Sequence, residues 1–497
     1  MNTVAELIAG APGATPAAGG ELKPSVPVKL VYSVGQTIES GYLVISGFVF
    51  FYYTAVLGLS GSAVGVALGL SMVLDSLIDP LIGSMSDNIR SRFGRRLPMM
   101  LVGAPLTALA MWALLNPPIG IAGPALFAWL FITKAGFRGF ASLYNLPYAA
   151  LGAEMANGYV ERGSIAAYRA IIGNMAALAI TAVALGGFFA GAGGLQIREH
   201  YPPFGVAMAV VMVVSGLVAA AGVWRYALSL PQPTTPPATL ARGLAQGLPE
   251  VFRNGSFRSL FGCTVMFWIA AGINGALNNH AYTFVWKLRP EQIQFVSYAY
   301  YGAILLGVPL ARALLALLEK KTVLLLGLAG LIGSLSLVHA ARALGLIAPT
   351  GADALAILMI NVTFGGLGVA LLSVTAPAMM ADAADEHEIL FGARREGLYF
   401  AGLGFASKAA TGLGQVAAGF ALDALQLPKA AAMAAGAQIP EHVLRLLILA
   451  WGPLAAAFAV GAALSLAGYH LTRAKHAEMA VRLSAKRADD LSAGRTT

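Results

Sequence analysis

Residues 61–85 read GSAVGVALGLSMVLDSLIDPLIGSM, a stretch long and apolar enough to cross a membrane apart from its two aspartates. Asp75 and Asp79 are four residues apart, so a helix places both carboxylates on one face. A charge at the centre of a membrane helix costs about 2.5–3.5 kcal/mol, and two carboxylates also repel each other. The pair therefore predicts a site for a coupling cation. The alternative is a structural pair that hydrogen-bonds to a neighbouring helix and binds nothing.

The composition of the chain is that of a polytopic membrane protein. Of its 497 residues, 58% are hydrophobic and 11% are charged, whereas soluble domains carry about 25% charged residues. The net charge of +9 comes from basic residues that flank the apolar segments and set their orientation. We therefore expect the lipid bilayer, and no nucleic acid, as a partner. The single cysteine, Cys263, excludes an internal disulfide and a cysteine-based metal site.

Windows of about 20 apolar residues predict membrane helices. There are twelve, at residues 29–53, 62–85, 97–115, 124–155, 164–191, 203–229, 259–282, 293–317, 322–343, 353–380, 397–424 and 444–471. Six spans, a proline-rich connection and six further spans are the layout of the major facilitator superfamily. Such transporters bind their substrate near the midplane between two six-helix halves, which rock to give alternating access.

We therefore predict an all-α polytopic membrane protein with the major facilitator fold and 12 transmembrane helices in two six-helix halves. The Lys and Arg residues gather in the loop after span two, in the middle connection and at the C-terminus, which places both termini in the cytoplasm. The predicted parts are an N-terminal tail at 1–28, a first half at 29–229, a linker at 230–258, a second half at 259–472 and a C-terminal tail at 473–497.

Three further ionisable residues lie inside predicted spans, where an unpaired charge is costly. Glu39 in span one is expected either to contact the substrate or to form a salt bridge to a neighbouring helix. Arg169, at the start of span five, is its expected partner, unless the side chain extends to the membrane surface. Lys408 in span eleven must pair with an acid, stay neutral or reach the surface. Asp75 and Asp79 are its natural partners, and a cation that enters their site would release the lysine.

Span four and the predicted cytoplasmic ends carry further polar groups. Lys134 and Arg138 are expected to extend to the outer surface, whereas the polar run at 142–148 is expected to line a cavity. Acids and arginines near the cytoplasmic ends predict an ionic lock between the halves. Its residues are Asp87, Arg95, Arg96, Asp382, Asp385, Arg394 and Arg395.

The sequence contains no phosphate-binding glycine loop and no grouping of Ser, His and Asp. The chain is therefore predicted to be neither an enzyme nor directly driven by ATP. The rival interpretation is a membrane-embedded enzyme such as an acyltransferase, for which only His387 and its acidic neighbours offer a catalytic group. A metal site formed by residues 385–388 is a further, less favoured alternative to the lock.

Three motifs resemble the glycoside–pentoside–hexuronide:cation symporter family, whose best-known member is the melibiose permease. They are LDSLIDPLIGSMSDNIRSRFGRRLPMM from Leu74, NLPYAALGAEMANGYVERGSIAAYR from Asn145 and DAADEHEILFGARREGLYFAGLGFASK from Asp382. The resemblance extends over about residues 31–424. It implies symport of a sugar-like solute with Na⁺, Li⁺ or H⁺.

The resemblance also implies roles for individual residues. Asp75 and Asp79 match two aspartates that bind the cation in that family, and Ser142 falls where a threonine contributes to the same site. Lys408 matches a lysine that links the cation and sugar sites. Na⁺ at the two aspartates is the only metal expected.

On the substrate side, Glu39 stands where the family has a sugar-binding aspartate, and Arg169 where it has a sugar-binding arginine. Three positions depart from the melibiose permease. Asn145 replaces a sugar-binding aspartate, Ala149 a stacking tryptophan and Ile78 an asparagine of the cation site. These departures argue against melibiose as the solute and favour H⁺ over Na⁺.

We therefore predict a secondary active transporter of a bacterial inner membrane that couples H⁺ or Na⁺ to symport of a sugar or glycoside-like solute. The alternatives are a carrier of an amphipathic or lipid-like solute and a proton-coupled exporter. No cofactor besides the coupling ion is expected, and the protein is expected to be a monomer. The predicted cation site is Asp75, Asp79 and Ser142, and the predicted substrate site is Glu39, Asn145, Arg169 and Lys408.

Overall fold

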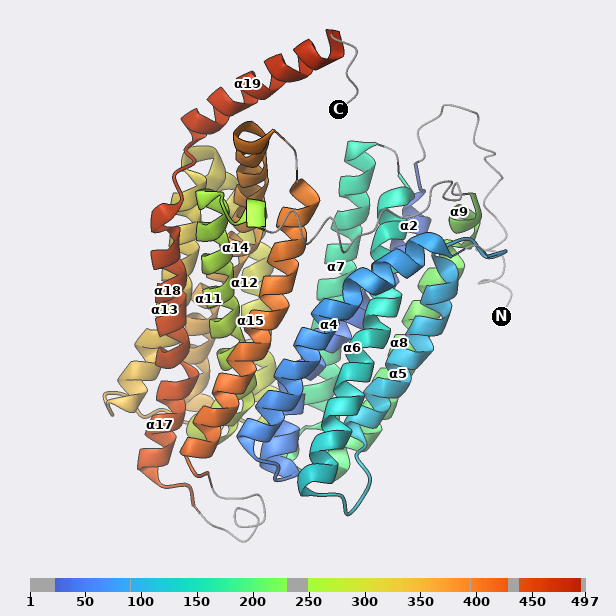
Figure 1. The fold of residues 1–497 in the computed structure, drawn as a ribbon. Helices are drawn as coiled ribbons and strands as arrows, with labels where there is room; N and C mark the ends of the chain where they lie inside the picture. Colours follow the sequence, from blue (N-terminus) through green and yellow to red (C-terminus); the bar gives the residue numbers. More distant parts are fainter. Residues whose placement is uncertain are drawn as a thin grey trace. The chain divides into compact units, whose positions relative to one another are not determined.

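The computed structural model describes residues 23–89, 91–156, 158–229, 249–392, 395–427 and 438–492. Over these residues the secondary structure is helical, without strands, and the prediction of an all-α membrane protein is confirmed (Figure 1). Much of the predicted N-terminal tail and linker, and Arg394 of the predicted lock, lie outside the described residues.

The chain divides into two compact units. The first consists of Met1–Val49, Leu77–Phe188 and Ile197–Pro237, and the second of Phe50–Ser76, Phe189–Gln196 and Ala238–Thr497. Two helices, α3 (Thr37–Phe51) and α4 (Gly61–Asn88), run from one unit into the other. The predicted boundaries of the two six-helix halves stay a prediction.

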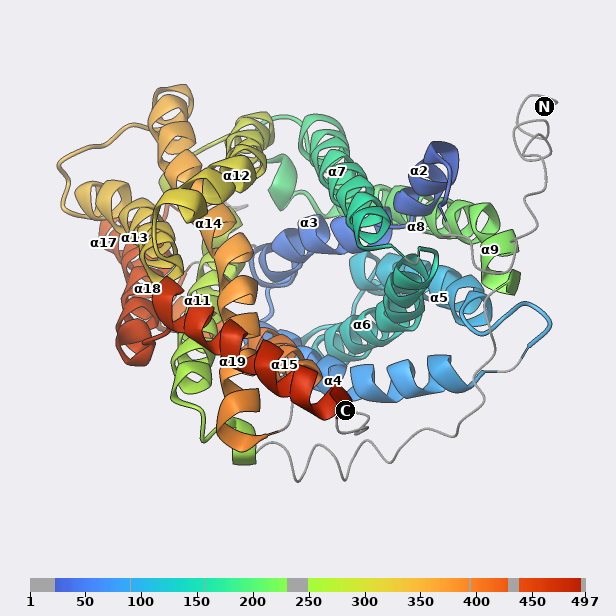
Figure 2. The same ribbon diagram turned by 90° about the horizontal axis from the view of Figure 1, so that it is seen from above.

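In the first unit, α5 packs against both α6 and α8, and α2 packs against α7 and α8 (Figure 2). Gly103 lets α5 approach α6 closely, because a Cβ at this position would lie 2.8 Å from the backbone nitrogen of Tyr144. The helices of this unit are α2 (Val26–Val34), α5 (Leu97–Leu115), α6 (Gly123–Glu154), α7 (Tyr159–Val183), α8 (Tyr201–Gly222) and α9 (Trp224–Ser229), with π-helix η2 (Ala184–Phe188) and 3₁₀ helix η4 (Arg198–His200).

In the second unit, α14 packs against α12 and α13, and α11 packs against α15 and α18. The long helices of this unit are α11 (Gly255–His280), α12 (Pro290–Leu317), α13 (Lys320–Ala343), α14 (Ala352–Phe391), α15 (Glu396–Ala424), α17 (Glu441–Trp451), α18 (Pro453–Ser465) and α19 (Arg473–Ser492). Its short helices are the π-helices η1 (Tyr52–Val56) and η5 (Ala281–Val285) and the 3₁₀ helices η3 (Gly194–Gln196) and η6 (Leu466–Gly468).

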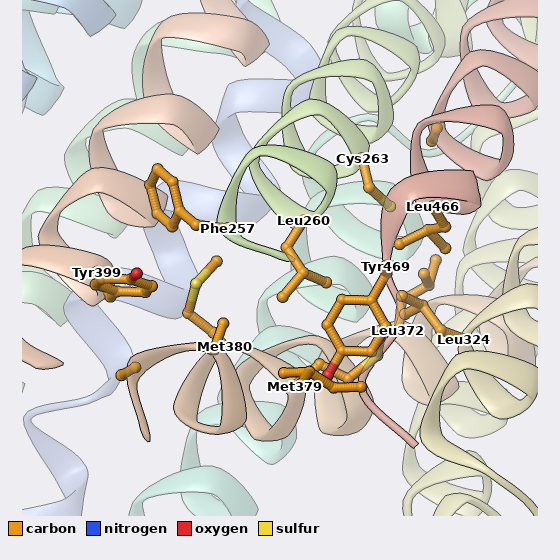
Figure 3. Close-up of a cluster of buried hydrophobic side chains, with 14 of the residues drawn as sticks. Phe257, Leu260, Cys263, Leu324, Leu372, Met379, Met380, Tyr399, Leu466 and Tyr469 are labelled. Atoms are coloured by element: carbon orange, nitrogen blue, oxygen red, sulfur yellow. The ribbon is translucent and has the colours of Figure 1, made fainter. Parts of the chain in front are cut away.

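A cluster of buried apolar side chains holds α11, α14, α15 and the segment after α18 together (Figure 3). Phe257 of α11 contacts Tyr399 of α15 ring to ring, with their centroids 4.7 Å apart. Met379 and Met380 of α14 lie in the same cluster. Cys263 is buried there as a free thiol and behaves as a small apolar residue.

Each of the twelve predicted spans contains a described helix, and ten of the described helical segments are long and apolar enough to cross a membrane. The two remaining spans are α6 and α15, which carry Lys134, Arg138 and Lys408 in their interiors. Two of the spans are interrupted in the structure. Span one divides between α2 and α3, and span twelve divides at Gly452 before Pro453, which has no backbone N–H to continue a helix.

Residues 473–492, in the predicted C-terminal tail, form the helix α19, which packs on the second unit. The helix α19 contacts α14. Arg473, at its start, donates from Nη2 to the carbonyl of Leu315, 2.9 Å away, and from its backbone nitrogen to Glu319, 3.0 Å away. Because the last carbonyls of a helix have no partner within the helix, Arg473 completes the C-terminal end of α12.

A line of glycines in the N-terminal part of α4 lies against α15, and both segments belong to the second unit. A Cβ at Gly65 would lie 2.6 Å from the carbonyl oxygen of Gln415, and one at Gly69 would lie 2.9 Å from that of Gly412. Small residues at four-residue spacing allow helix backbones in a membrane to approach closely. Asp423 of α15 also accepts hydrogen bonds from the first backbone N–H groups of α4, 2.6 Å from Gly61 N.

We predict that Gly65→Val destabilises the protein, because the added side chain meets backbone atoms of α15 that cannot move aside alone. Overpacking of this kind costs about 1–3 kcal/mol. The measurement is the melting temperature of the purified protein in detergent. Gly83→Val is the matched control on the same helix, since a Cβ there has nothing within 4 Å. Equal melting temperatures for the two variants would contradict the described packing.

Candidate functional site

The ion pair between Lys408 and Asp75 is the centre of the candidate site in the second unit. The distance from Lys408 Nζ to Asp75 Oδ2 is 2.7 Å, and the Asp75 side chain is 0% exposed. The predicted pairing of these residues is therefore present. A carboxylate buried in this way needs a countercharge, and removal of one partner of a buried ion pair typically costs about 3–5 kcal/mol.

Asp79 lies one helical turn after Asp75 on α4 and is half-buried, in the part of the helix that belongs to the first unit. Ser142 of α6 is a buried residue of the first unit. Carboxylate and hydroxyl oxygens are suitable ligands for a hard cation such as Na⁺, and a single carboxylate suffices to carry a proton. The grouping of these residues around one cation stays a prediction.

Glu39 and Asn145 of the predicted substrate site contact each other in the first unit. Asn145 Nδ2 donates a hydrogen bond of 2.6 Å to Glu39 Oε2, which joins α3 to α6. Both residues are half-buried. Asn145 offers an N–H donor to the glutamate, whereas a second carboxylate at this place would repel it.

Arg169 of α7 is held within the first unit. Its Nη2 donates to Gln36 Oε1 at 3.0 Å, and its guanidinium carbon lies 4.7 Å from the centre of the Tyr148 ring. Tyr148 stacks on Tyr32, and each hydroxyl donates to the other residue's carbonyl, at 2.5 Å and 3.0 Å. Tyr148 belongs to the polar run at 142–148 that the sequence singles out, whereas the sequence gives no signal for Tyr32.

The expectation that Lys134 and Arg138 extend to the outer surface is wrong. Lys134 is 1% exposed and Arg138 is 7% exposed. Both lie against the ring of Tyr42, with Lys134 Nζ 4.7 Å and Arg138 Cζ 4.4 Å from its centre. Lys134 Nζ also donates to Ser46 Oγ at 3.2 Å. The sequence could not show which face of α6 these residues occupy, and α6 turns both inward.

The arginines of the predicted lock in the first unit are paired within that unit. Arg96 contacts Asp87 and Glu154, each at 2.6 Å, and Arg95 contacts Glu154 at 2.7 Å. Burial disfavours the charged form of Arg96, but hydrogen bonds and attraction from Glu154 and Asp87 outweigh it and raise its pKa. Glu154 is a member of this cluster that the sequence did not single out.

The acids of the predicted lock in the second unit also have partners in their own unit. Asp382 lies 2.7 Å from Lys320 Nζ and 3.3 Å from His476 of α19. Asp385 lies 3.9 Å from the same histidine. Charges at helix ends are numerous in a membrane protein, so the sequence alone did not identify Lys320 and His476. The role of these residues in a lock between the halves stays a prediction.

Arg395 of the predicted lock pairs with Glu250 at 3.0 Å, within the second unit. His387, the residue on which the enzyme alternative depends, is 0% exposed and packs against the rings of Phe391 and Tyr399. Among the described residues, neither ring nitrogen of His387 has a hydrogen-bond partner. It therefore lacks the acid contact that orients a catalytic histidine.

The comparisons with known proteins agree with this picture. The family model for MFS/sugar transport proteins matches residues 31–473. An uncharacterized symporter of Synechocystis is 24% identical, over 92% of this chain and 96% of its own. The uncharacterized symporter YnaJ of Bacillus subtilis is 27% identical, over 82% of this chain and 83% of its own. The isoprimeverose transporter of Lactiplantibacillus pentosus is 22% identical, over 77% of each chain.

Solved structures show the same fold. A proton-dependent oligopeptide transporter has a TM-score of 0.61 at 15% identity, over 92% of this chain and 100% of its own. The nucleoside transporter NupG has a TM-score of 0.60 at 14% identity, over 89% and 99%. Together with the apolar helices, these matches establish a multi-pass membrane transporter rather than an enzyme. The chain is a secondary transporter that belongs to the MFS/sugar transport family of the major facilitator superfamily.

Proposed function

We propose that this transporter couples the entry of H⁺ or Na⁺ to symport of a sugar or glycoside-like solute. The observation that carries the proposal is the ion pair between Lys408 and the fully buried carboxylate of Asp75. In this structure the lysine supplies the countercharge that the carboxylate needs. A proton or a sodium ion at Asp75 and Asp79 replaces that countercharge, and Lys408 then becomes available to another partner.

Coupling follows from this competition. A ligand shifts a conformational equilibrium only by its difference in affinity for the two states. A cation neutralises the aspartates, and a solute binds the released lysine. Together they favour a conformational state that neither ligand stabilises alone. The proposal assigns the cation to Asp75 and Asp79 with Ser142, and makes Lys408 the link to the solute.

The solute side of the proposal uses Glu39, Asn145 and Arg169. Glu39 accepts hydrogen bonds from hydroxyl groups, while Asn145 fixes its position through the 2.6 Å contact. Arg169 donates hydrogen bonds, and the rings of Tyr32 and Tyr148 limit its movement. Several hydroxyl groups on one solute match this set of donors and acceptors. The name of the isoprimeverose transporter, a relative at 22% identity, supports a sugar-like solute.

The basic residues of the loops support a location in a bacterial inner membrane with both termini in the cytoplasm, by the positive-inside rule. On this orientation, the clusters around Arg96 and Asp382 lie at the cytoplasmic ends of their units. We propose that they stabilise the closed form of a cytoplasmic gate, together with Asp87, Arg95, Asp385, Arg394 and Arg395. The protein is proposed to act as a monomer, with no cofactor besides its coupling ion.

Asp79→Asn is predicted to abolish accumulation of solute against a gradient while exchange persists, because the coupling cation loses one of its two carboxylates. The measurement is uptake of labelled isoprimeverose, and of a panel of glycosides, into proteoliposomes under an imposed Na⁺ or proton gradient. Asp353→Asn, at an exposed position at the start of α14, is the matched control. Full accumulation by the Asp79→Asn variant would refute the assignment. Counterflow in the same vesicles separates uptake from export.

Lys408→Ala is predicted to uncouple solute from cation and to lower stability by about 3–5 kcal/mol, since Asp75 keeps a buried charge without its lysine. The double variant Asp75→Asn with Lys408→Gln removes both charges, so its melting temperature should recover while coupling stays lost. The two measurements are the melting temperature in detergent and the ratio of cation to solute transported. An unchanged ratio in either variant would show that the pair is structural.

A further inference from the structure

Span one is interrupted beside the proposed solute residues of the first unit. Gly35 and Gln36 separate α2 from α3. Their backbone nitrogens donate to the carbonyls of Tyr32 and Ser33, at 3.1 Å and 3.0 Å. These bonds reach back three residues instead of the four of an α-helix, so the chain turns more tightly here. Hinges in proteins are a few residues at the ends of elements whose backbone angles absorb a movement, and this break has that form.

The α2 side of the break is anchored to α6 and α7. Lys29 pairs with Glu161 of α7 at 2.6 Å. Tyr32 stacks on Tyr148 of α6, and the two residues exchange hydrogen bonds between their hydroxyl and carbonyl groups. Both tyrosines are buried, so these bonds are shielded from water. None of these four residues belongs to the proposed solute site, and we therefore expect α2 to keep its place when a solute binds.

The α3 side of the break is held by residues of the proposed solute site. Arg169 donates to Gln36 Oε1 from Nε at 3.3 Å and from Nη2 at 3.0 Å. One turn further along α3, Glu39 accepts a hydrogen bond from Asn145. Gln36 and Arg169 are both half-buried, so part of each side chain is accessible. A solute that binds Arg169 or Glu39 therefore competes with contacts that hold α3.

The side chain of Gln36 fits closely against α7. A Cβ at Gly173 would lie 2.8 Å from Gln36 Cγ and 3.2 Å from Ser40 Oγ. Gly173 comes four residues after Arg169, on the same face of α7. The glycine thus leaves room for the stem of Gln36 beside the guanidinium that binds its amide oxygen.

The amide oxygen of Gln36 occupies donors that an oxygen of the solute would use. Nε and Nη2 of Arg169 lie along one edge of the planar guanidinium, and both point at this single acceptor. A neutral acceptor is bound less strongly than a carboxylate. Several oxygens of one bound sugar can therefore outcompete the single oxygen of Gln36.

We propose that Gln36 is a positioning residue that holds Arg169 until a solute takes its place. The released Gln36 then lets α3 turn about the break at residues 35–36 relative to α2, so that solute binding changes the conformation of span one. A ligand shifts a conformational equilibrium only if it binds one conformation better, and the exchange of Gln36 for the solute supplies this difference. The inference rests on the proposed function, because it takes Arg169 as a solute ligand.

Gln36→Met tests the competition, because methionine keeps the length of the side chain but has no amide oxygen. Binding of isoprimeverose and of a panel of neutral glycosides to the full chain in detergent is measured by calorimetry. We expect the best-bound glycoside to bind about tenfold more tightly, which is the worth of one hydrogen bond to a charged group. Its transport into proteoliposomes should show a kcat about fivefold lower, since binding no longer releases Gln36. Gln36→Glu, whose carboxylate holds Arg169 more strongly, should weaken binding about tenfold.

Asn116→Leu is the matched control for the loss of an amide. The Asn116 side chain donates to the Trp112 carbonyl at the end of α5, so affinity and kcat should equal those of the unmodified chain. Weaker binding by Gln36→Met would show that Gln36 prepares Arg169 for the solute instead of competing with it. Unchanged affinity and kcat would show that the contact is structural. Either result overturns the proposal, and melting temperatures without ligand show that each variant folds.

Hydrogen exchange tests the hinge without any solute. Backbone amides of residues 33–40 are expected to exchange about tenfold faster in Gln36→Met than in the unmodified chain or in Asn116→Leu, because α3 has lost an anchor at the break. Equal exchange in the three proteins would overturn the proposal.

The two proposals fail in different ways. If exchange at residues 33–40 rises in Gln36→Met but no glycoside binds to any of the proteins, the hinge is supported and the sugar-like solute of the proposed function fails. If glycosides accumulate under a Na⁺ or proton gradient but bind no more tightly to Gln36→Met, symport stands and the role of Gln36 fails.

Discussion

The contact between Lys408 and Asp75 depends on how closely two helices approach. Asp75 is fully buried, so its carboxylate needs a cation at hydrogen-bond distance, and Lys408 provides it. The glycines of α4 make this approach possible, because they bring its backbone against that of α15. Asp423 fixes the same pair of segments at the start of α4. Residues outside the ion pair thus position the two charged groups that form it.

The first unit positions its cations by other means. Arg169 lies over Tyr148, and Lys134 and Arg138 lie against Tyr42. Aromatic faces, the amide oxygen of Gln36 and the hydroxyl of Ser46 restrain these side chains. The second unit, by contrast, opposes Lys408 to a carboxylate.

Much of the fold could be predicted from the sequence, because twenty apolar residues in a row have few alternatives to a membrane helix. The partner of Lys408 was predictable too, since a lysine that deep must find an acid and the acids in the spans are few. The inward position of Lys134 was not, because a long side chain can either reach the surface or turn inward, and the tertiary packing decides. Likewise, nothing in the sequence marks Glu154 as the acid that Arg96 contacts, or residues 35–36 as the place where span one divides.

The C-terminal helix has a practical consequence for protein production. Arg473 completes the end of α12 through its side chain and binds Glu319 through its backbone. His476, one turn further on, reaches Asp382. The helix α19 therefore packs as part of the second unit. Truncating it to improve yield would remove the hydrogen bonds that Arg473 donates to carbonyl groups at the end of α12. A purification tag belongs beyond α19, behind a spacer, and not in place of this helix.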